Sequence, residues 1–238
     1  MKKKNTIALV STTASSISSF MLGNIKKLSS HYNLVIFCSN AVSLKKLVPK
    51  KVLLTNINFK RKPNLIADLI SFCKLVYFLI INKPNLTISI SPKAGFITSL
   101  SSFVARVQYR IHWFTGQLWV TKKEPFRFFY KMLDKIIFYF SHHVLVDSNS
   151  QKKFLISSNI ITNRKSTVLL NGSVGGVNIK KFKFKRLNRN SLRKKLKISK
   201  NDFTFLYLGR INKDKGIIDL IKAFKKIENF YRTFLVLI

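Results

Sequence analysis

A short segment near the C-terminus carries the residues with the clearest chemistry. It reads LYLGRINKDKGIIDLIKAF, from Leu206 to Phe224. Gly209 lets the backbone approach a ligand closely, Arg210 and Lys215 supply two cations, and the following helix adds free N–H groups at its N-terminus. Together these features predict a binding site for a diphosphate. The alternative is an ordinary strand–loop–helix turn whose Lys and Arg side chains are solvated.

A second group of polar residues follows the first apolar run. The segment STTASSISS, residues 11–19, comes directly after a strand expected over Thr6–Val10. In a parallel α/β sheet the ligand crevice lies beyond the carboxyl ends of the strands. Thr12, Thr13 and Ser15 are therefore candidate binding residues at that edge.

Short apolar runs alternate with helical patterns along most of the chain. The predicted strands are Thr6–Val10, Leu34–Ser39, Val52–Leu54, Leu86–Ile90, Tyr109–Trp113, Val144–Asp147, Thr167–Leu170, Phe203–Leu208 and Thr233–Ile238. The predicted helices are Ser15–Ser30, Pro63–Ile81, Pro92–Arg106, Pro125–Ser141, Asn149–Ser158 and Ile217–Glu228, the prolines being expected in first turns and Asn149 as an N-cap. This alternation predicts an α/β fold with a parallel, doubly wound sheet.

The pattern changes after Leu170 and then restarts. Residues 1–172 are expected to form a complete N-terminal Rossmann-like domain, residues 173–200 a basic, solvated linker, and residues 201–238 the beginning of a second domain. Because two strands and one helix cannot close an α/β domain, we expect the second domain to be incomplete and the chain to be truncated there.

The charge balance favours anionic partners. The chain has 238 residues, of which 44 are Lys or Arg and 8 are Asp or Glu, giving a net charge of +36. Such a protein is attracted to nucleic acid or to an anionic membrane face. An A- and T-rich genome would also enrich Lys, but it does not explain why acidic residues are so few.

Two apolar features bear on the cellular environment. Cys38 and Cys73 lie in apolar contexts without a ligand spacing, which predicts buried free thiols in a reducing cytoplasm. The run Leu65–Ile81 is interrupted by Asp68 and Lys74, so it is a poor membrane span. It fits either a helix lying at a membrane interface or a buried helix of an α/β layer, and we favour burial of its inner face.

The C-terminal segment resembles the G-R-x-x-x-x-K-G-x-x-x-L-I-x-A-F signature of family-4 retaining glycosyltransferases. Other segments resemble this family in the same order along the chain. They are LLNGSVGGVNIKKF at Leu169–Phe182, SPKAG at Ser91–Gly95, IHWFTGQLW at Ile111–Trp119 and VLVDSNS at Val144–Ser150. The SPKAG segment is similar to the bacterial capsule and O-antigen branch.

The resemblance implies a GT-B fold and transfer of a sugar from a nucleotide-sugar donor to a polyprenyl-diphosphate-linked acceptor. Gly209, Arg210 and Lys215 would hold the donor diphosphate. The acceptor-side loops would include Thr12, Thr13, Ser15, Lys93 and Gly116. The implied role is surface polysaccharide synthesis, in lipopolysaccharide O-antigen or capsule, by a protein peripheral to the inner face of the bacterial cytoplasmic membrane.

The sequence departs from the family pattern at several places. Asn178 stands where the family has an aspartate, and Thr115 precedes Gly116 where the branch has a histidine. His112 is the nearest histidine, so His112 and Thr115 are the catalytic candidates, with a structural role as the favoured alternative for His112. The family's E-x7-E segment would lie beyond residue 238, which makes a separately encoded C-terminal half a candidate partner.

Other functions have less support in the sequence. No metal-ligand cluster or cofactor motif is present, so we expect neither a metal nor a cofactor. We expect this chain not to transfer sugar on its own. The alternatives to a transferase are an inactive fragment and a basic protein that binds polyanions or nucleic acid. Nucleic acid is not favoured because the Lys residues are dispersed and no known binding module is evident.

Overall fold

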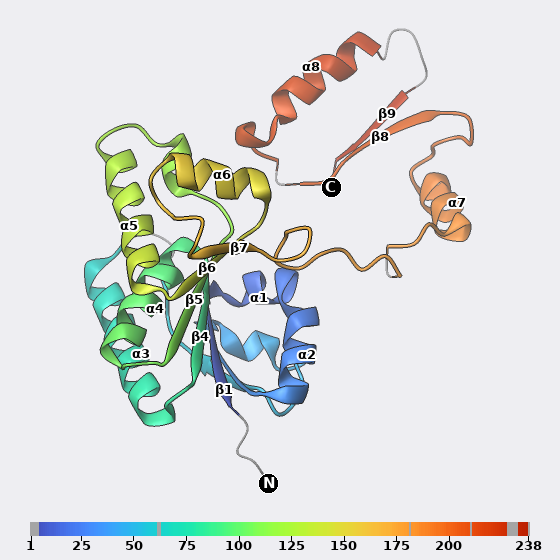
Figure 1. Cartoon of the computed structure of the whole chain (residues 1–238). Helices are drawn as coiled ribbons and strands as arrows, with labels where there is room; N and C mark the ends of the chain where they lie inside the picture. The colour runs from blue at the N-terminus through green and yellow to red at the C-terminus, as the bar shows by residue number, and fades with distance from the viewer. Residues whose placement is uncertain (1–4, 61–62, 181, 210, 228–232, 238) are drawn as a thin grey trace. The chain divides into compact units, whose positions relative to one another are not determined.

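The computed structural model describes residues 5–60, 63–180, 182–209, 211–227 and 233–237. The chain divides into two compact units, Met1–Gly176 and Val177–Ile238, which are considered separately below. Figure 1 shows the elements of both units.

The first unit is built on a seven-stranded, fully parallel sheet with strand order β3-β2-β1-β4-β5-β6-β7. This order confirms the predicted doubly wound α/β class. The strands are β1 (Thr6–Thr13), β2 (Asn33–Ser39), β3 (Leu53–Asn56), β4 (Leu86–Ile90), β5 (Tyr109–Phe114), β6 (His143–Val146) and β7 (Ser166–Val168).

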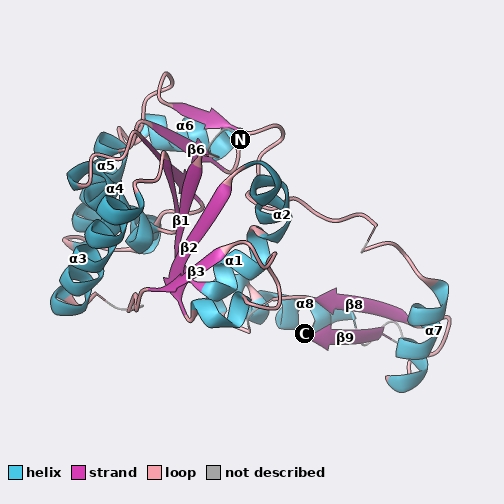
Figure 2. Cartoon of the chain, turned by 90° about the horizontal axis from the view of Figure 1, so that it is seen from below, coloured by secondary structure: helices cyan, strands magenta, loops and turns pink. Residues whose placement is uncertain are grey.

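Helices cover both faces of this sheet (Figure 2). They are α1 (Ala14–Phe20), α2 (Leu22–His31), α3 (Leu65–Asn82), α4 (Pro92–Val104), α5 (Phe126–Phe140) and α6 (Asn149–Ser157), with short 3-10 turns at Ala41–Leu44 and Leu118–Thr121. Helices α3, α4 and α5 pack side by side in one layer, and α1 and α2 lie on the opposite face.

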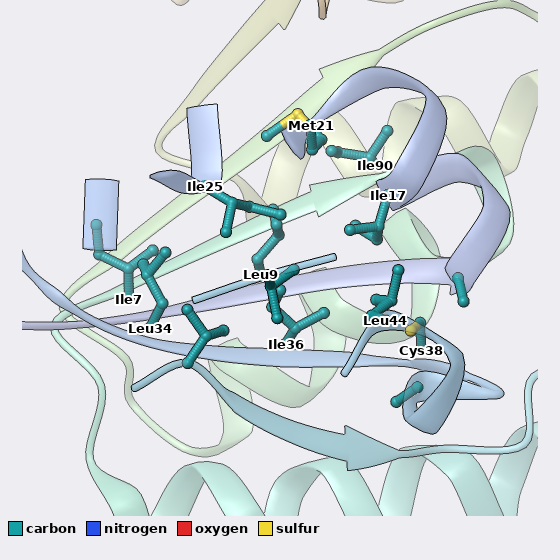
Figure 3. Close-up of a cluster of buried hydrophobic side chains, with 14 of the residues drawn as sticks. Ile7, Leu9, Ile17, Met21, Ile25, Leu34, Ile36, Cys38, Leu44 and Ile90 are labelled. Carbon is teal, nitrogen blue, oxygen red and sulfur yellow. The ribbon is translucent and has the colours of Figure 1, made fainter. Parts of the chain in front are cut away.

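The core follows from the alternation of side chains along the central strands. In β1, Ile7 and Leu9 join a cluster under α1 and α2, whereas Ala8 and Val10 join the cluster under α3 and α4. Figure 3 shows the first cluster, in which Leu9 lies among side chains from β2, α1 and α2. Since both faces of β1 are buried, its apolar run is uninterrupted rather than alternating with polar residues.

The predicted helix Ser15–Ser30 is wrong in one respect, because it consists of two helices that meet at Met21. Met21, with φ −114°, is both the C-cap of α1 and the N-cap of α2, and its side chain is buried in the core with Ile17 and Ile25. The Ser-rich first helix and Gly23 have low helix propensity, so core packing decides the geometry here.

The helix starts differ in part from those predicted. Pro92 opens α4 in its first turn, as predicted. Pro63 and Pro125, however, precede their helices. The N-cap of α3 is Asn64, whose Oδ1 accepts a hydrogen bond from Ala67 N at 2.8 Å. Pro125 is itself the N-cap of α5, which begins at Phe126. The N-cap of α6 is likewise Ser148 rather than Asn149.

The two cysteines lie in different surroundings. Cys38 is buried in β2, and burial raises the pKa of its thiol to about 11. The prediction for Cys73 is wrong, since its side chain is exposed on α3. An apolar context in the sequence does not tell which side of a helix faces the core.

Helix α3 has two apolar sides and buries only one of them. Ser71, Leu75 and Leu79, spaced four residues apart, face the core. In the described part of the chain, α3 is the one helix long and apolar enough to cross a membrane by length and composition. The inner side of α3 nevertheless packs into the core against the sheet, as we expected for that side.

The second unit contains the parallel strands β8 (Phe203–Tyr207) and β9 (Thr233–Leu237) and the helices α7 (Arg186–Lys195) and α8 (Ile217–Ile227). The expectation of a solvated linker up to residue 200 misses α7. Arg193 of α7 donates hydrogen bonds to the backbone oxygens of Ser199 and Asp202 and to Thr204 Oγ1, which attach α7 to the start of β8.

The two sides of α3 should differ in their effect on stability. We expect Leu75→Ala, at a fully buried position, to lower the free energy of unfolding by about 2–5 kcal/mol because it leaves a cavity in the core. Ile70→Ala, at a half-exposed position of the same helix, should cost less than about 0.5 kcal/mol. Urea unfolding of both variants tests this, and equal losses would contradict the assignment of the faces.

Candidate functional site

The first candidate site is the carboxyl edge of the seven-stranded sheet at β1 and β4. From β1 the chain continues to β2 and β3 on one side, whereas β4 leads to β5, β6 and β7 on the other. The chain thus turns away in opposite directions after β1 and β4, which is the point where doubly wound sheets bind ligands. Thr12 and Thr13 are the last two residues of β1, and Ser15 lies in the first turn of α1, which follows β1 directly. β1 therefore runs three residues beyond the predicted strand Thr6–Val10.

A short hydrogen bond joins the end of β1 to Ser91, the residue between β4 and α4. The hydroxyls of Thr12 and Ser91 lie 2.6 Å apart, and Thr12 N also donates to Ser91 Oγ at 3.4 Å. Ser91 has φ +80°, a left-handed conformation that is costly for a residue with a side chain. Strained residues of this kind cluster at functional sites, and the sequence motif SPKAG did not reveal the strain.

Of the other predicted residues near the ends of β1 and β4, Thr13 and Lys93 are engaged in contacts within the protein. Thr13 is the N-cap of α1, and its Oγ1 accepts from Ser16 N at 3.4 Å. Lys93 forms an ion pair with Asp68 at 2.8 Å and donates to the backbone oxygen of Lys60 at 2.7 Å. The Lys93 ammonium is therefore bound to α3 and the segment before it, whereas Ser15 is exposed.

Beyond β5, Thr115 and Gly116 are exposed in the loop that leads to the 3-10 turn Leu118–Thr121. Next to this loop, Trp113 Nε1 donates to Asp147 Oδ1 at 2.9 Å and so joins the ends of β5 and β6. Burial raises the pKa of the Asp147 carboxyl, and the Trp113 hydrogen bond opposes this effect. Sequence reasoning had not paired Trp113 with Asp147, because they lie far apart in the chain.

The segment after β7 crosses this edge and is held on the first unit. Ser173 N donates to Asp147 O at 2.8 Å, and Asn24 Nδ2 donates to Val174 O at 3.0 Å. Gly172 has φ +92°, and a Cβ there would overlap the backbone oxygen of Asp147. The NGS motif thus reflects a close backbone approach at the end of β6.

His112 is buried inside the β5–α4 contact and has no access to a ligand there. Its side chain is 1% exposed, its Nδ1 lies 2.8 Å from Ser89 Oγ, and a Cβ on Gly95 would overlap its ring. Burial lowers the pKa of the imidazole to about 3, so it is neutral. This placement favours the structural role over the catalytic one.

A second buried ionisable group lies on the inner side of α5. Asp134 of α5 is 3% exposed and accepts a hydrogen bond from Trp119 Nε1 at 2.8 Å. Burial raises the pKa of this carboxyl to about 7, although the Trp119 hydrogen bond lowers it. Asp134 is thus a core residue, away from the sheet edge.

The second candidate site is the loop between β8 and α8. Gly209 and Lys215 are exposed, and the 3-10 turn Lys213–Lys215 ends at Gly216, which has φ +71°. Leu220 N donates to Gly216 O, so the amides of residues 217–219 are the N-terminal N–H groups of α8 that have no partner within the helix. Arg210, the other predicted cation of this site, lies outside the described residues.

Two further observations bear on other functions, metal binding and polyanion binding. No group of three His, Cys, Asp or Glu side chains in the described residues could hold a metal ion. A basic hollow on the α7 surface is lined by Phe184, Arg186, Arg189, Asn190, Arg193, Lys194, Ile198 and Lys200. This hollow has the clustered cations and the exposed aromatic ring that polyanion binding requires.

The two buried groups should have opposing effects on stability as the pH falls. Between pH 6.5 and 3 only the unfolded chain protonates His112, which favours unfolding. Between pH 7 and 3.8 only the folded chain keeps Asp134 protonated, which favours folding. We therefore expect Asp134→Asn to lose about 2 kcal/mol of unfolding free energy from pH 7 to pH 5, and the unsubstituted protein to lose less.

Chemical denaturation at several pH values measures this difference. The control is the double variant Asp134→Asn/His112→Gln, which keeps the partly exposed His142 and His143 and removes only the buried imidazole. If the single and double variants show the same pH dependence, the assignment to His112 is wrong.

Gly172 and Gly176 form a matched pair, because both have positive φ. A Cβ at Gly176 would meet no atom within 4 Å, whereas one at Gly172 would overlap Asp147 O. We expect Gly176→Ala to cost about 1 kcal/mol of stability and Gly172→Ala about 1–3 kcal/mol more. Denaturation followed by Trp fluorescence checks both values, and equal costs would show that the segment does not depend on the close approach.

Comparison with known proteins identifies one family model and several relatives that are similar to this chain. Residues 188–238 match the family model for glycosyl transferases group 1. The capsular polysaccharide biosynthesis glycosyltransferase CapM of Staphylococcus aureus is 35% identical over 172 residues, which are 72% of this chain and 44% of CapM. The chain thus spans less than half the length of this curated relative.

Solved structures share the fold at low sequence identity. HepE of Anabaena, in complex with UDP and glucose, has a TM-score of 0.73 and 15% identity and covers 99% of this chain and 61% of its own. A glycosyltransferase from Rickettsia africae has a TM-score of 0.71 and 18% identity, and the match covers 99% of this chain and 60% of the Rickettsia chain. Sucrose-phosphate synthase from Thermosynechococcus elongatus has a TM-score of 0.70 and 16% identity, and the match covers 98% of this chain and 62% of the synthase chain. The chain therefore shares the GT-B fold of glycosyltransferases, and its C-terminal residues match glycosyl transferases group 1.

Proposed function

We propose that this chain belongs to a retaining glycosyltransferase of surface polysaccharide synthesis, in the capsule or the lipopolysaccharide O-antigen. The proposed reaction transfers a sugar from a nucleotide-sugar to a lipid-linked glycan acceptor. The bond from the anomeric carbon to the diphosphate oxygen breaks, and a bond to the oxygen of an acceptor hydroxyl forms. The nucleoside diphosphate leaves and takes up the proton of that hydroxyl, directly or through solvent. Support comes from the match to glycosyl transferases group 1 and from the similarity to CapM.

The observation that carries the proposal is the β8–α8 loop. This loop lies within the matched residues and brings an exposed Lys215 to the start of an 11-residue helix. A lysine and free N–H groups at one helix N-terminus are the means by which proteins hold a diphosphate. Both would stabilise the charge that develops on the diphosphate as it leaves the sugar. Arg210 is proposed as the second cation on its sequence position alone.

The acceptor is proposed to bind at the carboxyl edge of the first unit's sheet. Exposed or partly exposed hydroxyls there, on Thr12, Ser15 and Thr115, suit a polyhydroxylated sugar. A polyprenyl-diphosphate carrier would hold this acceptor at the inner face of the cytoplasmic membrane, so the protein would act there as a peripheral protein. The nucleotide-sugar is a substrate in this scheme, and the proposal requires no metal or cofactor.

Removing the Lys215 ammonium should weaken nucleotide binding. We expect Lys215→Ala to raise the dissociation constant for UDP and UDP-glucose by roughly 10- to 150-fold, because a charge-assisted contact contributes about 1.5–3 kcal/mol. The control is Lys222→Ala, which removes an exposed lysine further along α8. Isothermal titration calorimetry at constant ionic strength measures both affinities.

Two outcomes would count against the proposed diphosphate site. Equal affinities for Lys215→Ala and Lys222→Ala would remove the β8–α8 loop from the binding of the nucleotide. If Arg186→Gln/Arg189→Gln abolishes binding instead, the anion site is the basic hollow on α7. That result would support the alternative, a basic protein that binds polyanions.

A further inference from the structure

The outer side of α3 presents a largely apolar surface to solvent, opposite the buried line of Ser71, Leu75 and Leu79. Its apolar side chains form two groups, which are separated by the exposed Cys73 and Lys74. The exposed fractions are 75% for Ile66, 61% for Leu69, 51% for Ile70, 63% for Tyr77, 51% for Ile80 and 58% for Ile81. An 18-residue helix is about 27 Å long, so this surface is far larger than a single exposed side chain.

The apolar surface continues sideways onto α4. A hollow between the two helices is lined by Leu65, Asp68, Leu69, Phe72, Phe96, Ile97 and Leu100. Apart from Asp68, every residue of this lining is apolar. Because α4 packs beside α3, the hollow widens the apolar surface beyond the width of one helix.

Positive charge borders this surface at both ends of α3. At the C-terminal end, exposed Lys83 and Arg106 line one depression. At the N-terminal end, Lys60 is exposed and lies against Lys93, whose ammonium donates to the Lys60 backbone oxygen. Asp68 is the one acidic residue of α3, and it is paired with Lys93 at 2.8 Å.

We propose that this outer face of α3 docks in the plane of an anionic membrane. The apolar side chains would enter the boundary between headgroups and acyl chains, and the cations at the two ends would contact lipid phosphates. A second copy of the chain would suit the surface less well, because each copy carries a net charge of +36 and the same basic border. The proposal stands on exposure and charge and does not depend on the proposed transferase activity.

The docking would also orient the first candidate site. The N-terminal end of α3 is joined to the first turn of α4 by the Asp68–Lys93 ion pair, and α4 begins directly after Ser91. Docking through α3 would therefore bring the carboxyl edge of the sheet close to the lipid headgroups. An acceptor carried on a membrane lipid would need this placement.

Depth-dependent fluorescence quenching tests the proposal on the 238-residue chain. The variant Tyr77→Trp places an indole on the outer face, whereas the native Trp113 and Trp119 are 6% and 1% exposed. We expect brominated acyl chains to quench this indole in vesicles that contain phosphatidylglycerol. Quenching should be weaker at high salt and with phosphatidylcholine alone. Without quenching in the anionic vesicles, the proposal fails.

A vesicle partition assay compares two charged variants. Ile70→Glu/Tyr77→Glu should lower the partition coefficient by roughly tenfold or more, because it places carboxylates in the docking surface. The control Val42→Glu/Leu47→Glu introduces the same charges at exposed apolar positions outside α3 and should reduce binding much less. Circular dichroism verifies that all variants are folded.

Equal losses in the two charged variants would show that only net charge matters and would overturn the docking role of α3. Sedimentation velocity tests whether a second copy of the chain binds to the outer side of α3 instead. A dimer that dissociates in Ile70→Glu/Tyr77→Glu, together with unquenched Tyr77→Trp, would assign the face to a second copy and reject the membrane.

Discussion

The parallel pairing of β1 with β4 is the constraint on which the rest of the first unit depends. Leu9 pairs with Ile88 and Val10 with Ser89, at the centre of a sheet that is covered on both faces. Parallel strands require crossover connections, which here provide the helices of both layers. All seven strands therefore end at the same edge, and the hydroxyl side chains of Thr12, Ser15 and Thr115 lie along it.

The same burial determines the protonation of groups that look functional in the sequence. His112 lies in a central strand beneath α4, where no water can solvate an imidazolium. Asp134 lies beneath the 3-10 turn that contains Trp119, where desolvation favours the neutral acid. Each group has one side-chain hydrogen-bonding partner, so the core tolerates both as neutral polar groups.

The high net charge is distributed in several ways. Lys93 and Arg193 are engaged in contacts within their own units, whereas Lys215 and the cations that border α3 are exposed. Since exposed cations are available to anions and engaged ones contribute to the fold, the total of +36 does not by itself locate a binding site. The candidate anion-binding positions are those where the local structure leaves cations exposed, in the β8–α8 loop and at the ends of α3.

The sequence alone determined the fold class and most strand positions. Buried parallel strands are uninterrupted apolar runs, and Leu86–Ile90 was predicted with the bounds that the structure has. The order of the polar loops also followed from the sequence, because parallel strands place them at one edge. The bends and caps at Met21, Asn64 and Ser148 depend on packing and hydrogen bonds that propensity does not determine.

Only the tertiary structure decided which way individual side chains face. It buried His112, tied Lys93 to Asp68, exposed Cys73 and joined Trp113 to Asp147. It also left the outer side of α3 uncovered, although both sides of that helix are apolar in sequence. When both sides of a helix are largely apolar, their periodicity does not indicate which side meets the sheet, and packing against the neighbouring helix and strands decides it.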